Sequence, residues 1–279
     1  MRKREKTYLP DASAFPVGVP AGVIDAVRAL YKACSTRRVT WPLNACVGCC
    51  MDAQLAREMC DWDLRSLTAT HVYEYQDAAH DAAQDADEYL HFLPKVAELI
   101  SQGDTGLVRH STEIVLERLG GFDHALLSQQ EKHAIAHWAL ALWQWWLDSV
   151  GEGKFALRYE TADGLLVMFA RAGLSIDPML ASWQRCESSW AAVQFGLLMA
   201  EIDTGDLRAN GFADPCEELV PTIHAWAYRS EVYMHFAAIW EQLSDRDALR
   251  LCAGRPATEV SVCESLGPRL PGNAARASP

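Results

Sequence analysis

The sequence lacks the signatures of the familiar catalytic folds. No G-x-S-x-G elbow, phosphate-cradling glycine loop or Rossmann fingerprint occurs in its 279 residues. His133 and His137 are four residues apart, but no glutamate follows His133, so the zincin motif H-E-x-x-H is absent. The pattern gives no support to an α/β-hydrolase, a dinucleotide-binding enzyme or a zincin.

Long apolar runs are also missing. The longest candidate, "AIAHWALALWQWWL", contains His137 and Gln144 and falls short of the roughly 18 residues that a membrane span needs. The basic opening "MRKREK" is followed by "TYLPDASAFPVGVPAG", which has three prolines and an aspartate where a signal peptide needs a continuous apolar segment. The nine cysteines are an odd number, and no N-x-S/T acceptor occurs. We therefore expect reduced thiols and a cytoplasmic location.

Positive charge is scarce. Lys and Arg together number 25 against 37 Asp and Glu, which gives a formal net charge of -12. Such a chain repels phosphate backbones and anionic membrane surfaces, so we expect neither a nucleic acid nor a membrane as its partner. A protein partner, basic if the interaction is electrostatic, is the favoured alternative.

Apolar residues recur every three or four positions from near Ala21 to near Leu251, and strand-like alternation is almost absent. This predicts an all-α protein with a single multi-helix domain over residues 20–255. A stack of helical hairpins is one arrangement that fits the similar helix lengths. Residues 1–19 and 256–279 lack this periodicity and are expected to form flexible N- and C-terminal segments.

Local signals place several helix boundaries. Ser128 and Glu131 form a capping box that opens a long helix over 128–149. Thr68 or Thr70 can cap a helix near its start. Pro94 lies inside the helical pattern of residues 84–101, where it predicts either a bend or the start of a second helix.

Four segments carry a resemblance: "CVGCC", "DADEYLHFLPKVAELI", "LERLGGFDHALLSQQEKHAIAHWALALW" and "LSIDPMLASWQRC". Together they resemble a group of bacterial helical proteins in which D-x-D-x-(F/Y)-x-HFLP and E-x2-A-x3-F/W-x2-ALW segments occur in the same order. The resemblance covers roughly residues 40–210. It implies a helical fold and a bacterial source, and it carries over no catalytic residue because the group has no assigned activity.

Three cysteines lie within "CVGCC". Cys46 and Cys49 form a C-x2-C pair, which can bind zinc or exchange disulfides, but a structural zinc site takes four ligands and no second such pair occurs. Cys34 and Cys60 flank the pair and could complete a thiolate set with it. Cys50 is a further candidate. The alternatives are a redox pair and small buried residues that begin a helix.

Two other patterns contain ligand-type side chains. Glu88 and His91 have the E-x-x-H spacing of helical di-iron proteins, which need a second such unit that this sequence does not clearly supply. His133 and His137 share one helix face and could share a metal ion.

An acidic run and one tryptophan are candidate interaction residues. The run comprises Asp77, Asp81, Asp85, Asp87 and Glu88, and is interpreted as a solvated face or as a surface for a basic partner. Trp41, which precedes Pro42 and the cysteines, could be an exposed anchor.

Two function hypotheses follow. The first is a non-enzymatic, acidic, helical protein-interaction module, either immunity- or inhibitor-like or an accessory subunit of a bacterial complex. The second is a metal-binding protein or metal-dependent enzyme, with zinc as the cofactor and the cysteines or the Glu88/His91 and His133/His137 faces as ligands.

Overall fold

The computed structural model describes residues 8–80, 86–103, 115–148, 160–204 and 219–243. These residues form eleven α-helices and no strand, which confirms the all-α prediction. They group into two compact units, the first running to Trp145 and including Ala172–Leu174, the second comprising the remainder. None of the described helices is both long and apolar enough to cross a membrane.

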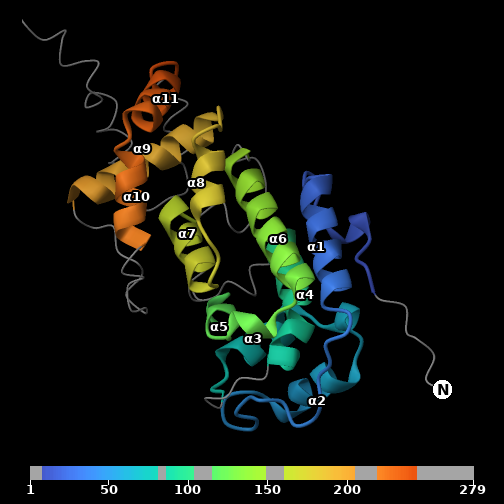
Figure 1. Ribbon diagram of the computed structural model, residues 1–279. Coiled ribbons are helices and arrows are strands. Elements are labelled where there is room, and N and C mark those ends of the chain that lie inside the picture. The colour runs from blue at the N-terminus through green and yellow to red at the C-terminus, as the bar shows by residue number, and fades with distance from the viewer. Residues whose placement is uncertain (1–7, 81–85, 104–114, 149–159, 205–218, 244–279) are drawn as a thin grey trace, which may run out of the picture. The chain divides into compact units, whose positions relative to one another are not determined.

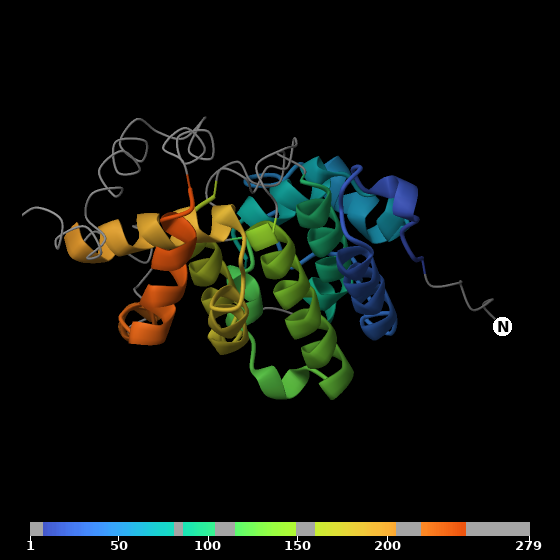
Figure 2. The ribbon, with the colours of Figure 1, turned by 90° about the horizontal axis from the view of Figure 1, so that it is seen from above.

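The first unit is built around α4. Its helices are α1 (Ala21–Ala33), α2 (Ala53–Asp61), α3 (Ala69–Asp77), α4 (Ala86–Gln102), α5 (Glu117–Gly120) and most of α6 (Gln129–Asp148). Helix α1 lies along α4 in both ribbon views (Figures 1 and 2), and α3 also packs against α4. From Glu88 to Ser101 nearly every residue of α4 is buried, so this helix forms the centre of the unit.

Three of the buried α4 residues are charged, namely Glu88, Lys95 and Glu98. Charged side chains are buried only when they have partners. Their partners, described below, are residues of α1, α3 and the loop before α2, in addition to neighbours on α4 itself. Pro94 does not start a second helix, because α4 continues through this residue as a single helix.

Helix α6 begins as predicted. The Ser128 backbone N–H donates to Oε2 of Glu131 at 2.8 Å, and the Glu131 N–H donates to Oγ of Ser128 at 3.2 Å, so the capping box is formed. Ile135, Trp138 and Leu142 are buried along one stripe of the helix. Trp138 donates its indole N–H to Oγ of Ser101 on α4 at 3.1 Å, which joins the two helices at a polar contact inside the core. Of the two threonines that could cap α3, Thr68 is the residue at its N-cap.

The second unit contains α7 (Ala162–Arg171), α8 (Asp177–Trp183), α9 (Ser189–Thr204), α10 (Leu219–Ala227) and α11 (Ser230–Trp240). Helix α9 packs against α7 and α11. Trp183, Phe195, Trp226 and Phe236 form an aromatic cluster, in which the Phe195 and Phe236 rings are stacked with centroids 4.5 Å apart. The chain breaks its helical course near Arg229, because α10 ends at Ala227 and α11 starts at Ser230.

A three-thiol loop as candidate metal centre

The segment between α1 and α2 folds back on itself at the cysteines. The N–H groups of Cys50 and Met51 both donate to the carbonyl of Cys46 at 3.1 Å, and the Gly48 N–H donates to the Met51 carbonyl at 2.8 Å. Gly48 has φ +87°, a conformation that side-chain-bearing residues rarely adopt. The glycine in "CVGCC" therefore allows the turn that brings the thiols together.

The turn places the sulfur atoms of Cys46, Cys49 and Cys50 within 4.8 Å of one another. Cys49 and Cys50 are exposed and Cys46 is half-buried. Within the part of the chain that the structure describes, this is the one group of three or more His, Cys, Asp or Glu side chains close enough to hold a metal ion together.

The pKa values of the two exposed thiols, Cys49 and Cys50, shift in opposite directions. A hydrogen bond from the Ala79 backbone, followed by bonds from the Cys49 and Cys46 thiols, lowers the pKa of Cys50. The hydrogen bond with Cys50 and the charge of Cys50 raise the pKa of Cys49. The Cys50 thiolate therefore forms more readily than that of Cys49, and the neighbouring thiols hydrogen-bond to it. Since the thiolate is the form that binds metals, Cys50 is more readily available as a ligand than Cys49.

The loop is fixed to the core of the first unit at two points. Asn44 donates its backbone N–H to both carboxylate oxygens of Glu88, at 3.0 and 3.1 Å, and Tyr75 donates its hydroxyl to Oε1 at 2.8 Å. The Cys46 N–H donates to the Ala79 carbonyl at 2.7 Å. Glu88 is 4% exposed, so its carboxylate holds the start of the loop from inside the core.

The chain around Ala79 is held in turn by Arg118. This half-buried guanidinium donates to the carbonyls of Gln76 at 2.6 Å and Ala78 at 2.9 Å. His80 places one ring nitrogen 2.8 Å from the Tyr75 carbonyl and the other 3.0 Å from Arg118. Because a guanidinium only donates, the nitrogen that faces Arg118 is placed as an acceptor, and both ring nitrogens of His80 have partners. These contacts hold the backbone to which the loop is bound. In metal sites, hydrogen-bond partners of this kind orient the residues that bind the ion.

The remaining predicted thiolate ligands lie elsewhere. Cys60 is half-buried in α2, where burial raises its pKa to about 11. Cys34 is 4% exposed at the end of α1, where burial raises its pKa to about 12. Neither belongs to the close group of three. The structure therefore does not assemble the set Cys34, Cys46, Cys49 and Cys60, and Cys50 takes the third position instead.

The two histidine patterns remain separate from this group. His91 has its Nδ1 3.2 Å from the Arg37 carbonyl, whereas the Glu88 carboxylate is engaged by Asn44 and Tyr75, so this E-x-x-H pair does not share a ligand. Burial lowers the pKa of His91. The exposed rings of His133 and His137 are stacked with centroids 6.3 Å apart, and no third ligand-type side chain joins them among the described residues.

The predicted acidic face is divided by the fold. Asp77 is exposed at the end of α3, and Asp87 is exposed on α4, where it forms an ion pair with Arg37. Glu88 points into the core, so its assignment to a surface patch is wrong. Asp81 and Asp85 lie outside the described residues.

Trp41 is exposed to 40%, and the guanidinium of Arg57 lies 3.7 Å from its ring centroid. This is a cation–π contact at the surface, between the loop that carries the cysteines and α2.

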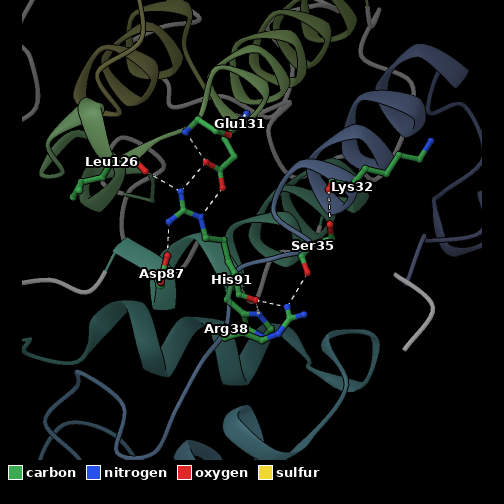
Figure 3. A network of polar contacts seen from close by, with 9 residues as sticks. Lys32, Ser35, Arg38, Asp87, His91, Leu126 and Glu131 are labelled. Carbon is green, nitrogen blue, oxygen red and sulfur yellow. Dashed lines mark hydrogen bonds and ion pairs between the residues drawn. The ribbon is translucent and has the colours of Figure 1, made fainter. Parts of the chain in front are cut away.

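A polar network around Arg37 was not predicted (Figure 3). Arg37 donates from Nε to Oε1 of Glu131 at 2.6 Å and from Nη2 to Oε2 at 2.7 Å, in a bidentate ion pair. The same guanidinium donates to the Leu126 carbonyl at 2.9 Å and to Asp87. The Arg37 carbonyl accepts from Arg38. Arg37 and Glu131 are 94 residues apart, and the sequence indicated only the capping-box role of Glu131, not its pairing with Arg37.

Comparison with protein-family models, with curated proteins and with solved structures gives no match for this chain.

Proposed function

We propose that this protein binds a thiophilic metal ion through Cys46, Cys49 and Cys50. The observation that carries the proposal is the convergence of the three sulfur atoms within 4.8 Å on a loop fixed to a buried carboxylate. Thiolates are soft ligands that select Zn²⁺ and Cu⁺ over hard cations such as Mg²⁺ and Ca²⁺. The exposure of Cys49 and Cys50 leaves the sulfurs open to an ion from solvent.

Three thiolates leave one coordination position of a tetrahedral ion available. Structural zinc sites are closed by four protein ligands, whereas sites with three keep a place for water or for an incoming group. For Zn²⁺ this centre therefore corresponds to an open site, suited to metal exchange or to binding of an added ligand.

Replacing Cys46 and Cys49 together with serine is expected to abolish metal binding. Elemental analysis of the reduced wild-type chain should give about one zinc or copper per chain, because the three thiolates bind as one unit. The Cys60→Ser and Cys186→Ser variants serve as controls, since these half-buried thiols lie outside the group. Retention of metal by the double variant, or nine free thiols and no metal uptake in the wild type, contradicts the proposal.

A second candidate function is recognition of a basic protein partner. The observation that favours it is the exposed Trp41 with its Arg57 contact, on a chain of net charge -12. Aromatic and arginine side chains are enriched at interface hot spots, and complementary charge speeds association. A module of this type fits an inhibitor-like role or an accessory subunit.

Salt dependence tests this second candidate. With a partner identified by pull-down, the association rate is expected to fall as ionic strength rises, and Trp41→Ala should raise the dissociation rate. Trp62→Ala is the matched control, because Trp62 is similarly exposed at 44%. An association rate that does not change with salt contradicts the electrostatic version.

A further inference from the structure

The thiol loop offers three sulfur donors and no fourth ligand-type side chain within the described residues. Ions differ in whether three sulfur donors fill all of their bonding positions. Zn²⁺ completes a tetrahedron with a fourth ligand. Trivalent arsenic takes three bonds in a pyramid and keeps its lone pair at the apex, so three thiols satisfy it completely.

Charge distinguishes the candidates further. Three thiols that release their protons to Zn²⁺ leave a complex of charge -1, and Cu⁺ with three thiolates leaves -2. Trivalent arsenic leaves a neutral complex. The negative charge of Asp77 acts on Cys50, Asp52 follows two residues later, and the whole chain carries -12. Acidic surroundings penalise an anionic complex and leave a neutral one unaffected.

We propose that Cys46, Cys49 and Cys50 form a three-sulfur site for trivalent arsenicals, with arsenous acid as the species bound. This inference rests on the thiol centre of the proposed function and specifies its ligand class. Each cysteine sulfur attacks arsenic, one As–S bond forms and one As–O bond breaks, and the thiol proton leaves with the hydroxyl as water. Three such steps convert As(OH)₃ and three thiols into As(S-Cys)₃ and three waters, with no change of oxidation state.

The geometry suits all three steps. The exposed Cys49 and Cys50 thiols are accessible to a small neutral solute, and the half-buried Cys46 thiol can close the third bond. Three sulfur atoms bonded to one arsenic atom lie closer together than 4.8 Å. The three thiols already lie within this distance of one another, so only a small approach is needed. Because Glu88 and the Ala79 backbone fix the loop, little ordering remains to be done on binding.

Two arsenicals separate a three-sulfur site from an ordinary vicinal dithiol. Sodium arsenite supplies three replaceable oxygens, and phenylarsine oxide forms only two As–S bonds because the phenyl group occupies the third position. We expect the reduced full-length chain to bind one arsenite with loss of three titratable thiols, and one phenylarsine oxide with loss of two.

Single serine variants provide the decisive comparison. Cys46→Ser, Cys49→Ser and Cys50→Ser should each weaken arsenite binding by at least about 100-fold, since the lost bond was formed intramolecularly. Each variant retains two thiols and should still bind phenylarsine oxide. Cys60→Ser should bind both probes as the wild type does.

The outcomes separate this inference from the proposed function. If Zn²⁺ or Cu⁺ binds in a manner dependent on these cysteines and arsenite does not, the arsenical site is overturned and the metal centre stands. Loss of only two thiols to arsenite, or unchanged arsenite affinity in any of the three variants, also overturns it. If neither the metal ions nor arsenite binds, both proposals fail.

Discussion

Replacing Glu131 with glutamine is expected to lower the free energy of unfolding by about 3 kcal/mol, because it removes one partner of a nearly buried ion pair. The carboxylate is 2% exposed and the Arg37 side chain 16%. Glutamine preserves the size of the side chain and can still serve in a capping box, so the variant isolates the charge. Arg37 keeps Asp87 and the Leu126 carbonyl, which places the expected loss at the low end for such pairs.

Alanine at position 131 should cost about 1 kcal/mol more, because the reciprocal bonds with Ser128 are then lost as well. Gln130→Ala is the matched control, since Gln130 is exposed in the same first turn of α6. Urea unfolding followed by circular dichroism measures the differences. Equal stability of the Glu131→Gln and wild-type chains would show that Asp87 alone satisfies Arg37.

The same ion pair gives a pH dependence with a definite sign. Burial raises the pKa of Glu131, but the hydrogen bonds from Arg37 and Ser128 outweigh it, and the pKa lies below its ordinary 4.5. A carboxyl group whose pKa is lowered by folding stabilises the folded state above the unfolded pKa, and this contribution disappears as pH falls through the folded value. The stability difference between wild type and Glu131→Gln should therefore be full at pH 7 and decrease below about pH 4.5.

Local sequence rules account for much of the fold. The capping box of Ser128 and Glu131 spans three residues, and Thr68 lies directly before its helix, so nearest-neighbour chemistry determines both. The course of α4 through Pro94 was left open by the sequence, because the local cost of proline competes with burial of the helix on nearly all sides. Tertiary packing decides that competition.

Part of the candidate site could also be predicted, because it depends on local sequence. Cys46, Cys49 and Cys50 meet through one turn, and the left-handed Gly48 that allows it lies between them in the sequence. Whether Cys34 and Cys60 join the group of thiols depends on how α1 and α2 pack. The spacing of the cysteines in the sequence contains no information about that packing. The inward direction of Glu88 likewise follows from contacts with Asn44 and Tyr75, distant in sequence from it.

The second large effect is expected from Lys95→Met, which should lower the free energy of unfolding by about 3–5 kcal/mol because it leaves a buried carboxylate without its counter-ion. Lys95 donates from Nζ to Oε1 of Glu98 at 2.8 Å, and Glu98 is 1% exposed. Tyr31 donates to the other oxygen at 2.6 Å, and Gln102 donates to Oε1 at 3.2 Å. These two neutral donors hydrogen-bond the carboxylate but do not neutralise its charge.

A double replacement distinguishes loss of the counter-ion from loss of packing. In the Lys95→Met, Glu98→Gln chain no charge remains at either position. The new amide can accept from Tyr31, and it can donate to Gln102 once the Gln102 amide has rotated. We expect stability to return to within about 1 kcal/mol of wild type, since a buried ion pair is often no more stable than a neutral replacement. Glu98→Gln alone should be destabilising, because the buried ammonium of Lys95 then lacks its anion. If the double variant is as unstable as the sum of the two single variants, the two side chains act independently, and the losses arise from packing around α4 instead of from the pair.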